Sequence, residues 1–209
     1  HNINQAIQEL EKAKEIGRDN TLVLTNVAKY FGELGKIDEA IDIYNKIIAQ
    51  NSANDVVRYN LALLLEGKGR KDEAISEYKK VLELNPKYFQ VILHLALLLE
   101  QDRKYKDALD LYMRLENMNY EDDYTIEKIA SAGIYAGECQ VSEIFYKKLD
   151  LTTNFKVFAN NIGICWAQKK EYEKAKTWWE KALAIDPNYS EPKDNLKRLQ
   201  GLPQPLTTQ

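Results

Sequence analysis

The sequence predicts an all-α protein built from stacked, antiparallel helix hairpins. Three observations support this prediction. A small residue recurs every 34 or 33 positions, a large side chain follows each one by four positions, and glycine or Asn-Pro interrupts the apolar pattern between them. A constant period of this length is typical of repeat proteins, whose units bury their apolar faces by stacking. The small residues are Ala6, Ala40, Ala74, Ala108, Ser142 and Ala175, and the large ones are Leu10, Tyr44, Tyr78, Tyr112, Tyr146 and Trp179.

Residues 55–86 show how one unit is built. Apolar residues at helical spacing fill positions 57–65, and two glycines follow before a second helix that contains Ala74 and Tyr78 and ends at Pro86. Two short helices joined by a tight turn form an antiparallel hairpin. An alanine lets two helices cross closely, and an aromatic residue four positions later covers the next turn of the same face.

These residues match a known spacing. In residues 156–187 the pattern consists of Ile162-Gly163, Trp166, Ala175, Trp179, Ala182 and Pro187, and residues 89–120 and 21–52 follow it in the same register. The pattern resembles the tetratricopeptide repeat, over residues 2 to about 187. A long coiled coil is excluded, since no heptad continues through the glycine breaks.

The resemblance implies a right-handed superhelical solenoid of antiparallel hairpins, with five full units, an N-terminal half unit and a C-terminal capping helix. We expect the repeat array at residues 1–201 and a proline-containing tail or linker at 202–209. A half unit leaves one face uncovered, so we expect the chain to be part of a longer protein. Within the array, the predicted parts are the half repeat 1–20, repeats 21–54, 55–88, 89–122, 123–155 and 156–189, and the cap helix 190–201.

The fourth unit departs most from the pattern. Gly133 replaces an aromatic residue, Ser142 replaces the usual alanine, and the register is one residue short near residues 150–156. These changes predict either a local bend or softer joint, or neutral drift. Cys139 and Cys165 fall at dissimilar positions of different units, so two free thiols are expected and a disulfide is the alternative.

Composition excludes several classes of function. The chain has 29 basic and 32 acidic residues, a net charge of −3, and no basic stripe of the kind that nucleic-acid binding requires. No apolar run approaches the roughly 20 residues of a membrane span. No leader peptide is visible, and the compartment is left open, with the cytoplasm slightly favoured.

The sequence contains no recognisable catalytic constellation. His94, Cys139 and Cys165 lack the spacing of metal ligands, and no glycine-rich phosphate loop follows a strand. We therefore expect no enzyme activity, no cofactor and no metal.

The resemblance also implies a binding groove lined by the first helix of each hairpin. At the sixth position of these helices stand Asn26, Asn60, His94, Lys128, Asn161 and Asn195. An asparagine amide offers a donor and an acceptor, so it can pair with a peptide group of an extended ligand. The alternative is that these amides bind their own neighbours or water.

Apolar residues interleave with this row and complete the predicted site. They suit an amphipathic helix or an apolar peptide, or they pack on one another. Acidic residues on the same side, among them Glu66, Glu100 and Glu127, favour a ligand with Lys or Arg. A clamp for a C-terminal carboxylate is not expected, because only Asn60 and Lys29 fit its pattern. The other predicted contacts are Tyr59, Leu63, Leu93, Leu97 and Tyr124.

The predicted function is a non-catalytic scaffold that binds a peptide or amphipathic helix of a protein partner in this groove. Two alternatives remain open. One is self-assembly into a homo-oligomer through the N-terminal half unit or the tail, and the other is a recruiting arm of a larger enzyme.

Overall fold

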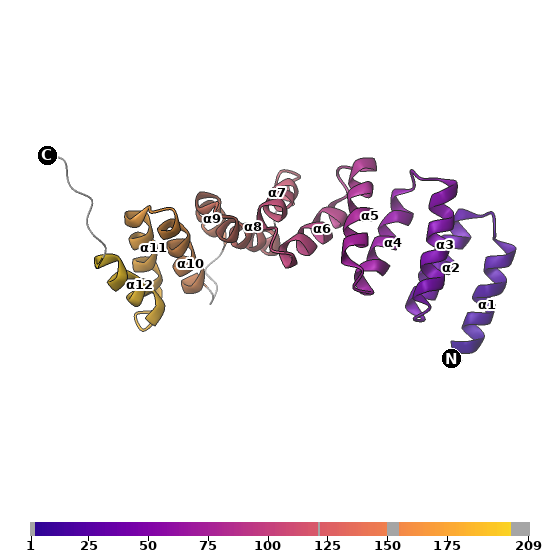
Figure 1. Cartoon of the computed structure of the whole chain (residues 1–209), viewed down its shortest axis with the longest axis horizontal. Helices are drawn as coiled ribbons and strands as arrows, with labels where there is room; N and C mark the ends of the chain where they lie inside the picture. The colour runs from indigo at the N-terminus through magenta and orange to yellow at the C-terminus, as the bar shows by residue number, and fades with distance from the viewer. Residues whose placement is uncertain (1–2, 121, 150–154, 202–209) are drawn as a thin grey trace. The chain divides into compact units, whose positions relative to one another are not determined.

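The computed structural model describes residues 3–120, 122–149 and 155–201. These residues form twelve helices and no strand (Figure 1), so the predicted all-α class is confirmed. The predicted repeat boundaries and the number of complete units stay predictions. The helices are α1 (Ile3–Ile16), α2 (Thr21–Glu33), α3 (Ile37–Gln50), α4 (Asp55–Gly67), α5 (Lys71–Leu84), α6 (Phe89–Gln101), α7 (Tyr105–Glu116), α8 (Asp123–Ala136), α9 (Cys139–Tyr146), α10 (Phe155–Gln168), α11 (Tyr172–Ile185) and α12 (Ser190–Gln200).

Short polar signals set where several helices begin. The side chains of Asn20, Asn54 and Asp122 each accept a hydrogen bond from a backbone N–H in the first turn of α2, α4 and α8. The tight turn between α4 and α5 needs a residue in the left-handed conformation, and Gly69 takes φ +75° there. At the equivalent turn between α10 and α11 this conformation falls on Lys170, with φ 63°.

The chain divides into two compact units between Leu98 and Leu99, within α6. In unit 1, α2 packs on α3 and α4 packs on α5, while α4 also contacts α2 and α3. Ala40 and Ala74 are fully buried where the paired helices meet, and Tyr44 and Tyr78 are buried beside them. Helix α1 contacts α2 but has no buried residue of its own.

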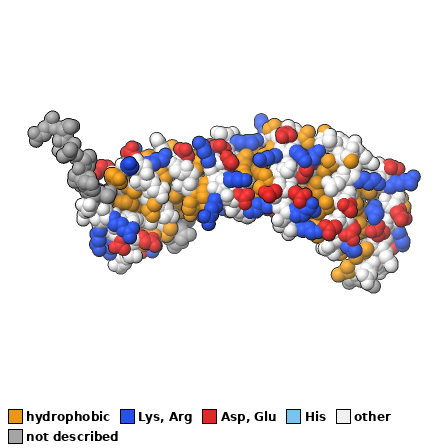
Figure 2. All heavy atoms as spheres, viewed as in Figure 1, with side chains coloured by type: hydrophobic (Ala, Val, Ile, Leu, Met, Phe, Trp, Pro, Cys, Tyr) orange, Lys and Arg blue, Asp and Glu red, His pale blue; other side chains and the backbone are white. Residues whose placement is uncertain are grey.

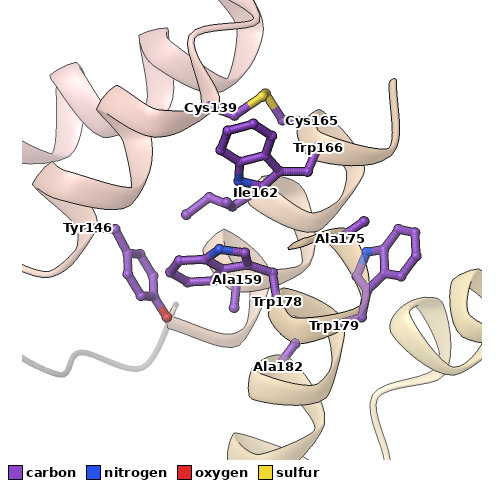
Figure 3. Close-up of a cluster of buried hydrophobic side chains, with 10 residues drawn as sticks. All are labelled: Cys139, Tyr146, Ala159, Ile162, Cys165, Trp166, Ala175, Trp178, Trp179 and Ala182. Carbon is purple, nitrogen blue, oxygen red and sulfur yellow. A yellow bond between two sulfur atoms is a disulfide. The ribbon is translucent and has the colours of Figure 1, made fainter. Parts of the chain in front are cut away.

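In unit 2, α8 packs on α7 and α9, and α10 packs on α11 and also contacts α8 and α9. A core cluster fills the space around α10 and α11 (Figure 3). Within it the indole N–H groups of Trp166 and Trp178 both donate to a carboxylate oxygen of Glu143, at 2.6 and 2.5 Å. The cluster consists of Cys139, Tyr146, Ala159, Ile162, Cys165, Trp166, Ala175, Trp178, Trp179 and Ala182.

A disulfide joins Cys139 to Cys165, so the expectation of two free thiols is wrong (Figure 3). Cys139 begins α9 and Cys165 lies in the last turn of α10, and their Cα atoms are 5.8 Å apart. The two positions are dissimilar within a repeat. They nevertheless meet because the second helix of one hairpin packs on the first helix of the next.

The unusual small residues of the fourth unit have a packing role that neither sequence interpretation named. A Cβ atom at Gly133 would lie 2.4 Å from Oγ of Ser142 and 3.2 Å from the carbonyl oxygen of Glu138, so α8 and α9 cross closely here and a larger residue would force Ser142 to shift. The predicted register shift involves residues 150–154, which lie outside the described residues, as does the predicted tail at 202–209.

Candidate functional site

Most residues predicted to face the groove belong to helical stripes with the spacing i, i+4, i+7 and i+11, whereas Tyr59 and Leu93 stand at i+3, beside the stripes of α4 and α6. In unit 1 the stripes run along α2, α4 and α6. Asn26 and Lys29 of α2 are exposed, and Lys29 lies 4.0 Å from the carboxylate of Glu33. The other predicted residues of unit 1 are half-buried, and they are Tyr59, Asn60, Leu63, Leu93, His94 and Leu97.

Part of the predicted apolar surface in unit 1 packs on itself. The ring of Tyr59 lies 5.1 Å from the ring of Tyr88 and 6.2 Å from those of Tyr78 and His94. Burial raises the pKa of the Tyr59 hydroxyl. Tyr59 therefore belongs to an aromatic cluster. This agrees with the alternative interpretation of the sequence, in which the apolar groove residues pack on one another.

Glu66 organises the polar part of the same surface. One of its carboxylate oxygens accepts a hydrogen bond from the hydroxyl of Tyr78, at 2.6 Å, and lies 3.2 Å from Nδ1 of His94. Burial first, and then the bond to Glu66, raises the pKa of Tyr78 far above its usual range. His94, predicted to contact a ligand, is thus also held by an internal partner.

Unit 2 repeats this arrangement 34 residues later. Glu100 accepts from the hydroxyl of Tyr112 at 2.7 Å and from Nζ of Lys128 at 3.1 Å. Two of the acidic residues expected to attract a basic ligand, Glu66 and Glu100, are therefore already paired. Sequence reasoning missed this network, although its signal is present: each glutamate stands 12 positions before a buried tyrosine and 28 positions before a His or Lys.

Two hollows in unit 2 contain predicted residues, and both are lined in part by α10. The α8–α10 cavity has a volume of about 310 Å³. Its lining contains the predicted residue Asn161, and the exposed Tyr135, whose ring stacks on that of Tyr105 at 4.8 Å. The lining residues are Glu127, Ser131, Ile134, Tyr135, Val157, Phe158 and Asn161.

The α10–α12 cavity has a volume of about 320 Å³ and a largely apolar lining. The predicted residue Asn195 lies in this lining, but its Nδ2 also donates to Oδ1 of Asn160 at 3.2 Å. Both cavities are at the lower end of the range for small-molecule sites, a size that suits individual side chains of a larger ligand. The lining residues are Ile164, Ala167, Gln168, Tyr172, Trp179, Asn195, Arg198 and Leu199.

Three of the predicted asparagines differ from Asn195. The side-chain amides of Asn26, Asn60 and Asn161 make no hydrogen bond to another described residue, which leaves their donors and acceptors open to solvent or a ligand. Tyr124 is also exposed, with Nζ of Lys128 lying 5.6 Å from the centre of its ring. Sequence reasoning therefore named Glu127 and Asn161 of the α8–α10 cavity and Asn195 of the α10–α12 cavity, but it missed the apolar lining of both.

The charged side chains outside the cavities are mixed in sign. On the face drawn in Figure 2, acidic and basic groups alternate over the described surface. A larger hollow of about 600 Å³ lies in unit 1 between α1 and α3, but its three cations and three carboxylates balance and it contains none of the predicted site residues.

In the described part of the chain, no three His, Cys, Asp or Glu side chains gather in a way that could hold a metal ion. No described helix has the length and apolar character needed to cross a membrane.

Comparison with known families identifies two segments of the chain. Models described as tetratricopeptide repeat match residues 57–88 and residues 159–189. Among curated protein sequences, none matches the chain.

Several solved structures have a similar fold. YrrB, a tetratricopeptide repeat protein with an unusual peptide-binding site, aligns over 90% of this chain and 97% of its own, with a TM-score of 0.67 and 19% identity. A tetratricopeptide repeat protein from Parabacteroides merdae aligns over 95% and 78%, with a TM-score of 0.53 and 21% identity. MamA of AMB-1 aligns over 88% and 97%, with a TM-score of 0.60 and 18% identity. At these identities the likeness concerns the fold alone.

Proposed function

The chain belongs to the tetratricopeptide repeat family, whose members act as protein-interaction scaffolds, and from this premise we propose that unit 2 binds an extended peptide of a protein partner across α10. The observation that most supports this proposal is the open side-chain amide of Asn161. It has no internal partner among the described residues and lies on a stripe that connects two cavities. A peptide group over this amide can both donate and accept a hydrogen bond.

The stripe on α10 contributes to both cavities. Val157 and Asn161 line the α8–α10 cavity, and Ile164 and Gln168 line the α10–α12 cavity. Successive side chains of an extended chain point to opposite sides, so alternate residues of one peptide can enter hollows of this size. The description of YrrB as a peptide-binding repeat protein agrees with this proposal.

We propose that the predicted residues of unit 1 offer a second contact surface. Asn26 and Asn60 have open amides, and Leu63, Leu93 and Leu97 remain only half-buried. His94 and Glu66 contact each other, so in this proposal they stabilise the surface and do not contact the ligand directly.

The proposal is tested with degenerate peptide pools and two variants of equal charge change. Ile164→Glu introduces a carboxylate on the stripe, and Ala184→Glu introduces one on the exposed side of α11. We expect Ile164→Glu to weaken binding of the pools about tenfold or more, since burying a charge against an apolar ligand is costly. Ala184→Glu leaves binding unchanged. Equal binding by both variants, at equal helicity by circular dichroism, contradicts the proposal.

A second candidate function, self-association, is favoured by the exposure of α1. Its Ile3 and Ile16 side chains are 59% and 88% exposed, and the helix has no buried residue. Self-association through α1 predicts a sedimentation coefficient that rises with protein concentration. Replacing Ile3 and Ile16 with serine then abolishes the rise. A coefficient independent of concentration rules this candidate out.

A further inference from the structure

We infer that the peptide bound by unit 2 carries a basic side chain that pairs with Glu127 and, a few residues away, an acidic side chain that pairs with Arg198. This inference deepens the proposed function and rests on it. The occupant is thus a segment of another protein with one charge of each sign.

The first half of the inference concerns the α8–α10 cavity. Glu127 is the charged member of the lining, and its carboxylate makes no ion pair with a described residue, whereas Glu66 and Glu100 are both occupied. Tyr135 lies in the same lining and is 60% exposed. One face of the Tyr135 ring stacks on Tyr105, and the exposed remainder of the ring favours a cation, so this carboxylate and ring in one lining together suit a Lys or Arg side chain.

The second half concerns the α10–α12 cavity, where the charged residue of the lining is basic instead of acidic. Arg198 is the charged member of that lining and makes no ion pair with a described residue, although Asp194, one turn earlier on α12, lies 3.9 Å from Lys197. The floor beside it is apolar, with Ile164 and Leu199. A guanidinium at the rim of an apolar hollow suits an acidic side chain whose neighbours in the ligand are apolar.

The two cavities are close enough for one short segment. The α10 residues that line them are offset by seven positions, which is about 10 Å along the helix axis, and the cavities are separated by the width of one helix, roughly 10 Å. The resulting span of roughly 14 Å corresponds to about four residues of extended chain. The charges on the ligand should therefore be separated by three or four residues.

The inference is tested with synthetic peptide pools in which two positions, four residues apart, are fixed and the others are degenerate. One pool has Lys and Glu at the fixed positions, a second has two Lys, and a third has two Glu. Because partly exposed ion pairs are modest, we expect the mixed pool to bind about three- to tenfold more tightly than either of the others.

Charge reversal gives the sharper test. Glu127→Lys should transfer the preference to the pool with two Glu, and Arg198→Glu should transfer it to the pool with two Lys. Glu180→Lys and Lys176→Glu, two exposed sites on α11 outside both cavities, are the matched controls and should keep the preference for the mixed pool. Circular dichroism verifies that all variants are equally helical, and Glu127→Gln offers a milder second variant.

The outcomes separate the two proposals. Equal binding of all three pools, or a preference that the reversals do not transfer, overturns the charge inference and leaves the peptide-binding proposal standing. Absence of binding to any pool overturns both.

Discussion

At the scale of single residues, paired side chains decide which parts of the predicted site remain available. His94 and Lys128 occupy groove positions, yet each lies beside a glutamate that also holds a buried tyrosine hydroxyl. A polar side chain that is already paired contributes less to a ligand than a free one, because binding must first break or share the existing contact. The open amide of Asn161 is therefore the stronger candidate for a direct contact.

The left-handed turn before α11 gives a prediction about one residue. Lys170 adopts φ 63° where the equivalent turn before α5 has Gly69 at φ +75°. A residue with a Cβ atom is strained in this conformation by roughly 1 kcal/mol, and glycine is not. Lys170→Gly should therefore raise the free energy of unfolding by about that amount, measured by urea denaturation.

Gly69→Ala is the matched control for this prediction. No atom lies within 4 Å of the Cβ that the substitution adds, so backbone strain is the main effect. The free energy of unfolding should fall by a similar amount. A loss of stability in Lys170→Gly would contradict the explanation.

The buried tyrosines predict loss of stability at high pH. Burial, followed by the charge of Glu33, raises the pKa of Tyr44 from 10.0 to about 12. Since the folded-state pKa lies above the unfolded one, this contribution is complete below pH 10 and disappears as the pH rises toward 12. Helicity should therefore fall in this range, together with the part of the tyrosinate absorbance that comes from buried tyrosines. Tyr44→Phe, which removes the titrating group, should shift the transition upward, and an unchanged transition would exclude Tyr44 as a cause.

At the scale of elements, the disulfide ties the short helix α9 to α10. The bond closes a loop between residues 26 positions apart, and both sulfur-bearing residues are buried. Both cysteines belong to the core cluster whose Trp166 and Trp178 donate hydrogen bonds to Glu143, so the bond reinforces the packing between two hairpins.

Reduction should lower the stability of the protein. A loop of this length corresponds to about 3 kcal/mol of stabilisation in the chain-entropy description. The melting temperature should fall when a reductant is added. A double variant, Cys139→Ser with Cys165→Ser, should have the lower value with or without reductant. Equal melting temperatures of the oxidised and reduced protein would show that the bond contributes nothing.

At the scale of the whole molecule, stability in a repeat protein is approximately a sum of contributions from each hairpin and its neighbours. Ala40 in unit 1 and Ala175 in unit 2 are both fully buried at helix crossings. Ala175→Leu overpacks its crossing and should reduce amide hydrogen-exchange protection in α10 and α11. Ala40→Leu should instead affect α2 and α3. A uniform loss of protection over both units in either variant would contradict this local model.

Much of the architecture was predictable because local rules determine it. The alternation of Ala40 with Tyr44, and of Ala74 with Tyr78, has one compact solution, a close helix crossing covered by an aromatic ring. The helix cap Asn54 acts within a few residues, and Gly69 adopts the left-handed backbone conformation that its tight turn requires. The all-α class follows from such short-range chemistry, repeated at a constant period.

The site depended on contacts between residues distant in sequence. The pairing of Cys139 with Cys165, and the closeness of Gly133 to Ser142, depend on how neighbouring helices are rotated and inclined, which a periodic pattern leaves open. The same freedom decides that Asn195 binds Asn160 while the amide of Asn161 remains open. The sequence by itself therefore determined the repeated hairpins and the residues on their stripes. Only tertiary packing decided which of those residues are paired and where two cavities form, because these properties depend on distances between helices.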